Sequence, residues 1–171
     1  DIGSKTPVHP NDHVNMCQST NDTFPTAINI ASVESAMHSL IPAIENLSNE
    51  LEKKSKDFDH IVKLGRTHLQ DATPLSLGQE FSGYAESMNN GIEKIKLSLN
   101  HCYELAMGGT AVGTGINSYE GFAEEVASEI ADITNLPFIT AKNKFEALGG
   151  QDSIVTLSSA LKGLAGSLFK I

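Results

Sequence analysis

Apolar residues recur at helical spacing over four stretches of this chain. In the first stretch, 30–51, steps of three and four residues alternate without a miss at Ile30, Val33, Met37, Leu40, Ile44, Leu47 and Leu51. Such a stripe is typical of a helix that buries one face against partners. We expect a capping residue within 21–23 at its start, and Pro42 predicts a kink or break near 40–41 because proline removes a backbone donor.

The second stretch predicts one long helix over 77–106, entered through a capping box formed by Ser76 and Gln79. At roughly 1.5 Å per residue this helix would be about 45 Å long, which exceeds the diameter of a compact domain of this size. Two further stretches predict helices over 120–134 and 152–171. No segment alternates long enough to indicate a real sheet, so we expect an all-α protein built as a long-helix bundle.

The 152–171 segment predicts association with other chains. Its apolar stripe is Ile154, Leu157, Leu161, Leu164, Leu168 and Ile171, and its other faces carry small residues and few charges. A helix with so little charge is typically surrounded by other helices. Since a chain of 171 residues is too short to surround this helix alone, we expect an oligomeric bundle.

Composition and charge narrow the classes of function. The net charge of −9 argues against nucleic acid as a partner, and no apolar run is long enough to cross a membrane. Cys17 and Cys102 match neither a disulfide framework nor a metal site, so we expect a reducing compartment. The glycine-rich segment 108–117 follows a helix and lacks the spacing of a nucleotide-binding loop. Because the chain begins with Asp1 and ends in mid-pattern at Ile171, we expect it to be a piece of a longer protein.

One polar stretch between the helices is the strongest candidate for chemistry. Residues 65–71 (GRTHLQD) bring a guanidinium, a hydroxyl, an imidazole, an amide and a carboxylate together without helical periodicity. Such a stretch is either a solvated loop or a ligand-binding connection, and rigid elements on both sides favour binding. It includes His68, and histidine is the side chain that titrates closest to working pH.

Six stretches carry a resemblance to a known family. They are residues 9–15 (HPNDHVN), 19–27 (STNDTFPTA), 65–72 (GRTHLQDA), 77–81 (LGQEF), 108–115 (GGTAVGTG) and 143–147 (NKFEA). In this order they resemble the class II fumarases of the fumarase and aspartase superfamily, over essentially the whole chain. The resemblance implies that residues 1–171 form a single central helical-bundle domain of that fold, without the family's N-terminal and C-terminal parts.

The activity implied by this resemblance is the reversible hydration of fumarate to (S)-malate. A histidine at the position of His68 is the catalytic residue that works with a water molecule in proton transfer. The family's mobile loop, which supplies the base for the C3 proton, lies outside this chain, so we expect the chain alone to be inactive. The resemblance implies no cofactor and no metal ion.

The resemblance also implies that Ser19, Thr20, Asn21 and Thr67 bind the substrate. Their hydroxyls and amide can donate to a carboxylate, and the first three stand at a helix start, whose positive end favours anions. The alternative interpretation of the first three residues is simple helix capping.

A second, peripheral dicarboxylate site of the family corresponds to His9, Pro10, Asn11 and Asp12. The alternative is a turn in which the side chains of Asn11 and Asp12 bond to their own backbone.

Two other functions stay open. Aspartases typically carry Gln at the position of His68, but Thr20 gives the aspartase-like spelling Ser-Thr-Asn-Asp, so aspartate ammonia-lyase is one alternative. A non-catalytic, self-associating helical scaffold is the other. The resemblance further implies a homotetramer with sites formed between subunits, located in the cytoplasm or, in a eukaryote, in the mitochondrial matrix. We expect neither nucleic acid nor a membrane as a partner.

Overall fold

The computed structural model describes residues 3–171 and is mainly helical. The chain forms two compact units, of which the first holds the segment up to Glu34 together with Leu99–Val155. The second unit holds Ser35–Ser98 together with Thr156–Ile171. Within residues 3–171, no helix is both long enough and apolar enough to cross a membrane.

The first unit combines helices with one very small parallel sheet. Its elements are the π-helical turn η1 (Pro10–Val14), α1 (Thr20–Ser35, except its last residue), β3 (Glu104–Leu105), α4 (Phe122–Thr134), β4 (Ile139–Thr140) and α5 (Lys144–Gly149). In the sheet, Glu104 lies opposite Ile139. The buried apolar core consists of Val33, Leu99, Cys102, Leu105, Ala106, Met107, Ala127, Leu136, Phe138 and Ala141.

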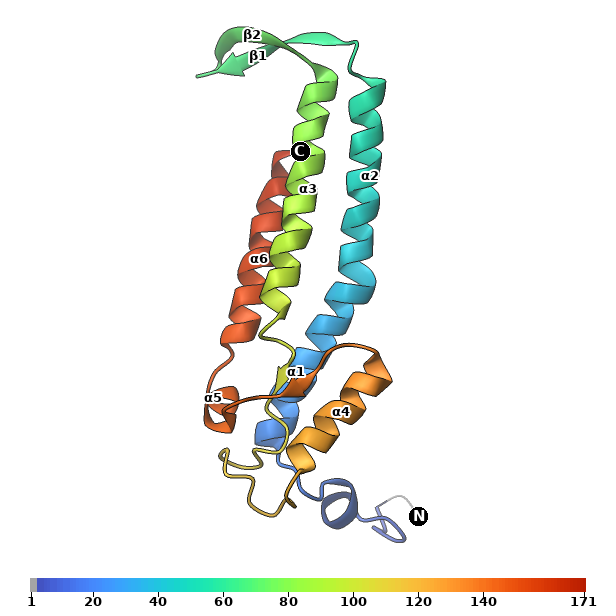
Figure 1. Cartoon of the computed structure of the whole chain (residues 1–171), viewed down its shortest axis with the longest axis vertical. Helices are drawn as coiled ribbons and strands as arrows, with labels where there is room; N and C mark the ends of the chain where they lie inside the picture. Colours follow the sequence, from blue (N-terminus) through green and yellow to red (C-terminus); the bar gives the residue numbers. More distant parts are fainter. Residues whose placement is uncertain (1–2) are drawn as a thin grey trace. The chain divides into compact units, whose positions relative to one another are not determined.

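The second unit is a bundle of three helices with a hairpin. Its elements are η2 (Ala36–Leu40), α2 (Ile41–Asp57), β1 (Val62–Thr67), β2 (Gln70–Ser76), α3 (Leu77–Leu99) and most of α6 (Asp152–Lys170). Figure 1 shows α2, α3 and α6 running side by side. Ser48 Oγ on α2 donates to the Ala85 carbonyl on α3 at 3.3 Å. At Gly91 of α3 an added Cβ would lie 2.9 Å from Leu164 Cδ1 of α6, so glycine permits this close approach.

The first helix starts earlier than the sequence predicts. Helix α1 begins at Thr20, upstream of the expected cap within 21–23. Ser19 is the capping residue, because its Oγ accepts a hydrogen bond from the Asn21 backbone N–H at 3.3 Å. The Asp22 carboxylate completes the cap by accepting from the Ser19 backbone N–H at 2.9 Å.

Several other predicted helix features are confirmed, but the break near 40–41 is not. The π-helical turn η2 ends at Leu40 and Pro42 stands in the first turn of α2, while the backbone of Leu40 and Ile41 stays helical, with φ values of −71° and −58°. The Ser76 N–H donates to Gln79 Oε1 at 2.9 Å, and the Gln79 N–H donates to Ser76 Oγ at 3.0 Å. Helices α4 and α6 correspond to the predicted 120–134 and 152–171 segments.

The predicted helix over 77–106 is too long by about two turns, because the observed helix ends seven residues earlier. Helix α3 ends at Leu99, where the Cys102 N–H closes a turn on the Leu99 carbonyl at 2.9 Å. The chain then enters β3. The helix is therefore about 35 Å long at roughly 1.5 Å per residue, and its length no longer argues for an oligomer.

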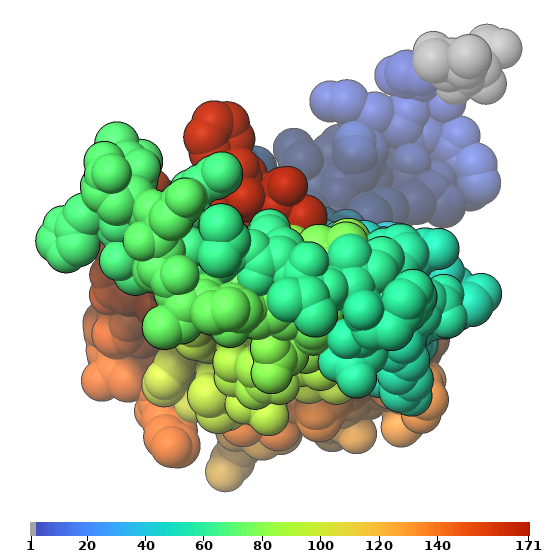
Figure 2. Space-filling view, turned by 90° about the horizontal axis from the view of Figure 1, so that it is seen from above, coloured from blue at the N-terminus to red at the C-terminus, as the bar shows by residue number. Residues whose placement is uncertain are grey.

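The expectation of an all-α long-helix bundle is confirmed in part, because residues 3–171 are mainly helical but also form two two-stranded sheets. The larger sheet is the antiparallel hairpin of β1 and β2, with a bulge between Leu64 and Arg66. Figure 2 looks onto the end of the second unit that carries this hairpin, whose atoms (green) lie at the surface. The run 60–64 had a strand-like composition but no clear alternation, so the hairpin went unpredicted.

Helix α6 leaves much of its apolar surface uncovered by this chain. Leu157 and Leu164 are buried, whereas Val155 is 62% exposed and Phe169 is 95% exposed. Uncovered apolar side chains of this size favour burial against another chain. The oligomeric bundle stays a prediction.

Candidate functional site

The candidate substrate residues Ser19, Thr20 and Asn21 stand at the start of α1, in the first unit. Ser19 caps the helix, so the capping interpretation is correct for this residue. Capping and ligand binding are compatible, because a helix start keeps a partial positive charge. The side chain of Asn21 has a different task, since its Nδ2 donates to the Ala111 carbonyl at 2.8 Å.

Asp22 connects this helix start to the glycine-rich loop. Its carboxylate is 0% exposed. One oxygen, Oδ2, accepts from the Gly108 N–H at 3.1 Å and from the Thr110 N–H at 2.7 Å. The sequence pointed to Asp22 only as a helix cap, although an aspartate directly after Ser-Thr-Asn was the available signal.

The loop that receives these bonds has an unusual backbone. Gly108 and Thr110 have φ values of 92° and 55°, in the left-handed region that favours glycine. At Gly108 an added Cβ would lie 2.4 Å from Ala123 Cβ, so this position has no room for a side chain. The Thr110 hydroxyl is buried and has no hydrogen-bond partner within residues 3–171.

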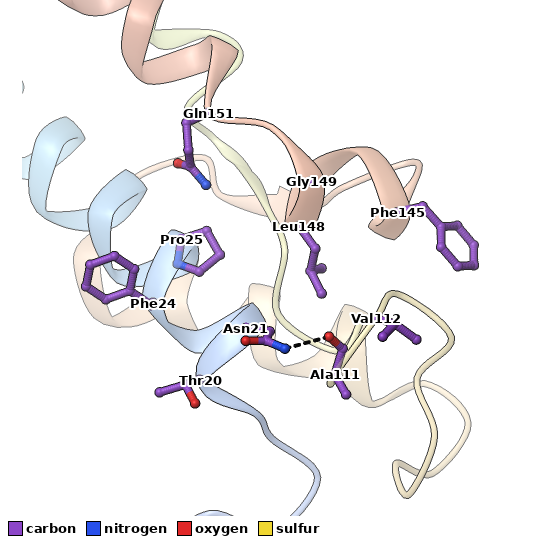
Figure 3. Close-up of a pocket in the computed structure, with 10 residues that line it drawn as sticks. All are labelled: Thr20, Asn21, Phe24, Pro25, Ala111, Val112, Phe145, Leu148, Gly149 and Gln151. Atoms are coloured by element: carbon purple, nitrogen blue, oxygen red, sulfur yellow. Dashed lines mark hydrogen bonds between the residues drawn. The ribbon is translucent and has the colours of Figure 1, made fainter.

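A pocket of about 480 Å³ opens where the helix start, this loop and α5 meet. Its lining residues are Thr20, Asn21, Phe24, Pro25, Ala111, Val112, Phe145, Leu148, Gly149 and Gln151. In Figure 3 the Asn21 amide reaches the Ala111 carbonyl along one wall, and Leu148 points from α5 toward that wall. The polar groups of this pocket come mainly from Thr20, Asn21 and Gln151.

A second pocket, of about 570 Å³, shares Ala111 with the first. Its lining residues are Asn11, Asp12, Asn15, Met16, Cys17, Gln18, Ser19, Thr110, Ala111, Ile116 and Asn117. The predicted substrate residues are thus divided: Thr20 and Asn21 line the first pocket, whereas Ser19 shares the second with two residues of the predicted peripheral site. The sequence did not indicate this division.

The predicted peripheral segment forms the turn η1, which begins at Pro10. His9 Nδ1 accepts from the backbone N–H groups of Asn11 and Asp12 at 3.2 and 3.1 Å. The His9 N–H in turn donates to His13 Nδ1 at 2.8 Å. The turn interpretation is therefore correct in kind, but the imidazole of His9 orders it rather than the side chains of Asn11 and Asp12.

Helix α5 is held in place by its cap and by one lysine. Asn143 Oδ1 accepts from the backbone N–H groups of Phe145 and Glu146, both at 3.0 Å. Lys144 Nζ donates to the Leu105 carbonyl at 2.8 Å. Burial lowers the pKa of Lys144, and the negative charges of Glu124 and Asp22 oppose this shift. Lys144 therefore anchors the helix that provides Phe145 and Leu148 to the pocket.

Thr67 and His68 belong to the second unit, at the tip of the hairpin. Thr67 pairs with Gln70, and the two residues between them, His68 and Leu69, have φ values of 50° and 62°. Two successive left-handed residues are the signature of a type I′ turn, which normally uses Asn and Gly. The turn exposes the imidazole, and Leu69 beside it is 93% exposed.

The base of the hairpin is fixed to α3 by a three-residue cluster. The Glu80 carboxylate accepts from Lys63 Nζ on β1 and from the Tyr84 hydroxyl, the latter at 2.6 Å. The Lys63 hydrogen bond, followed by that of Tyr84, lowers the pKa of Glu80. The same contact raises the pKa of Tyr84, because its ionised form would lose the bond and face a carboxylate.

Chemically, the first unit offers neutral donors at a helix start, which suits an anionic ligand. No cluster of three histidine, cysteine or acidic side chains that could hold a metal ion occurs in the part of the chain that the structure describes. The chain belongs to the lyase family, because the family model described as "Lyase" matches residues 2–171.

Within that family, the resemblance to class II fumarases is confirmed. The chain is 59% identical to the class II fumarate hydratase of Rhizobium meliloti (strain 1021), over 99% of this chain and 37% of that protein. It is 57% identical to the mitochondrial fumarate hydratase of Rhizopus oryzae, over 100% of this chain and 35% of that protein. The chain thus spans little more than a third of the length of these relatives.

A solved structure agrees with the sequence relatives. The crystal structure of class II fumarase from Schistosoma mansoni matches with a TM-score of 0.91 at 40% identity, covering 95% of this chain and 37% of that chain. A fumarate lyase:delta crystallin from Brucella melitensis, bound to cobalt, matches with a TM-score of 0.93 at 36% identity, over 98% of this chain and 36% of that chain.

Proposed function

We propose that the full-length protein containing this chain catalyses the reversible hydration of fumarate to (S)-malate, and that residues 1–171 form part of its central helical domain. The observation that carries this proposal is the 59% identity to a class II fumarate hydratase over 99% of the chain. The pocket at the start of α1 supports this proposal, because an acidic protein needs local hydrogen-bond donors without negative charge in order to bind a dianion, and the pocket has such donors.

In the proposed reaction, removal of the C3 proton of malate places a second negative charge on the adjacent carboxylate. Donors aimed at this carboxylate lower the barrier most when they are fixed before the reaction. We assign this role to Ser19, Thr20, Asn21 and Thr67. The positive end of α1 adds to their effect. His68 exchanges a proton with the water molecule that leaves or enters at C2.

We also propose that the protein is a homotetramer whose active sites combine segments of different subunits. The exposed hairpin tip and the uncovered apolar side chains of α6 support this assembly.

Because the family's proton-abstracting loop lies outside residues 1–171, we expect the chain alone to lack hydratase activity. His9, Pro10, Asn11 and Asp12 are proposed as a separate, peripheral dicarboxylate site. We expect the protein in the cytoplasm or, in a eukaryote, in the mitochondrial matrix; the Rhizopus oryzae relative is named as mitochondrial.

The test is to supply the purified full-length protein with malate and, separately, with aspartate, and to follow fumarate by its ultraviolet absorbance. Fumarate formed from malate alone supports the proposal. Fumarate formed from aspartate would favour the second candidate, an ammonia-lyase, whose typical motif spelling Ser-Thr-Asn-Asp this chain has because of Thr20. If neither substrate reacts, the protein is a self-associating scaffold and the proposal fails.

A further inference from the structure

Asp22 is the fully buried carboxylate to which the proposed reaction gives no role. Acidic side chains are almost never completely buried unless they are paired. Here the partners are three backbone N–H groups, those of Ser19, Gly108 and Thr110, at 2.9, 3.1 and 2.7 Å. Its two oxygens are thus directed at the protein backbone rather than at a ligand.

The three N–H groups belong to the two walls of the candidate site. Ser19 caps α1, and its hydrogen bond to Asp22 fixes the helix start. Gly108 and Thr110 lie 86 and 88 residues beyond Asp22 along the chain, in the loop that leads to Ala111. Ala111 lines both pockets and accepts from Asn21, so one carboxylate connects both walls.

The loop conformation needs this connection. Thr110 has a φ of 55°, and a β-branched residue in the left-handed region persists only when the surroundings impose it. The 2.7 Å bond from the Thr110 N–H to Asp22 supplies such a restraint. Without it, the loop can relax away from α1 and the donors at the helix start lose their fixed position.

We propose that Asp22 is a positioning residue of the dicarboxylate site. It holds the start of α1 and the loop 108–111 at a fixed separation, so that the donors of Thr20 and Asn21 keep fixed positions in the pocket toward one carboxylate of the substrate. Asp22 does not touch the substrate, and the inference rests on the proposed function for the identity of the ligand.

The test is Asp22→Asn in the full-length protein. Asparagine has the same shape, but its NH₂ group faces at least one backbone N–H, and two donors cannot bond to each other. We expect kcat/KM for malate to fall tenfold or more, equivalent to 1.4 kcal/mol, through a lower kcat as well as a higher KM, because the same donors stabilise the reacting carboxylate. The Kd of succinate, an unreactive four-carbon dicarboxylate, should also rise in calorimetry.

The matched control is Asn29→Ala on the same helix. Asn29 is 7% exposed and donates to the Glu104 carbonyl at 3.2 Å, away from both pockets. We expect this variant to melt at a lower temperature while the KM for malate and the Kd of succinate stay within twofold. If Asp22→Asn does not fold, Asp22→Glu replaces it, since a longer side chain keeps the charge but displaces both oxygens.

The inference is overturned if a folded Asp22 variant binds succinate as tightly as the wild type, or if Asn29→Ala weakens binding equally. A wild type that binds succinate but hydrates no fumarate would refute the proposed function alone, and the comparison of Kd values would still decide the role of Asp22. A wild type that binds no succinate would refute both.

Discussion

The substitution His68→Asn removes the imidazole at the hairpin tip without changing the conformation of the turn. His68 has a φ of 50°, and Asn is the residue other than glycine that best accepts this conformation. Asn is also preferred at the first position of a type I′ turn. The substitution therefore removes the imidazole and preserves the hairpin, which keeps its anchor through Lys63 and Glu80.

Loss of a proton-transfer group lowers kcat by roughly 10²–10⁴, which corresponds to about 3–5 kcal/mol in the barrier. We expect this decrease in the full-length protein, with the KM for malate within several-fold and the melting temperature unchanged. The control is His60→Asn, the same chemical change at an exposed histidine before β1. Its kcat should stay within twofold. A His68→Asn variant in which only KM changed, or in which kcat fell less than fivefold, would refute the catalytic role.

Three further predictions concern stability and assembly. Glu80→Gln should lose stability near neutral pH. The hydrogen bond from Lys63 lowers the pKa of Glu80 in the folded protein. The loss in unfolding free energy relative to wild type should therefore be constant above the unfolded pKa of about 4.3, and it should shrink as pH falls through the lowered folded pKa. Urea unfolding at a series of pH values measures this loss. Gly108→Ala should cost about 2–5 kcal/mol, because its φ is 92° and the nearest side-chain atom would lie at 2.4 Å. Gly83→Ala should instead stabilise α3 by about 0.5–1 kcal/mol, because no atom lies within 4 Å of the added Cβ. If urea unfolding gave the same change in unfolding free energy for Gly83→Ala and Gly108→Ala, this argument would be wrong. Phe169→Glu should reduce the molar mass seen by light scattering, since Phe169 is 95% exposed in one chain, and an unchanged tetramer would exclude Phe169 from the interface.

The helices were largely predictable because apolar residues recur at helical spacing along each of them, although α4 and α6 bury only part of that stripe within this chain. The end of α3 was not, because the stripe continues through Cys102 and Ala106, which are buried in the first unit after the helix has ended. The spacing of apolar residues predicts which side chains are buried, but it does not show that the helix ends at Leu99.

The hairpin escaped prediction for a different reason. Alternation arises when one face of a strand is buried, but Val62 and Leu64 are both exposed although they share a face of β1. The turn signal was absent as well, because His68 and Leu69 occupy positions that usually hold Asn and Gly.

The candidate site shows most clearly what a sequence leaves out. The residue types at the start of α1 indicated an anion site, but the bonds from Asp22 to Gly108 and Thr110 cross more than 80 residues and have no local pattern. They also resolve an electrostatic difficulty. A carboxylate next to Asn21 would repel a dianion, yet Asp22 is surrounded by three N–H groups and lies near the charge of Lys144. Since these groups compensate its charge, the donors of the pocket remain available to the proposed dicarboxylate ligand.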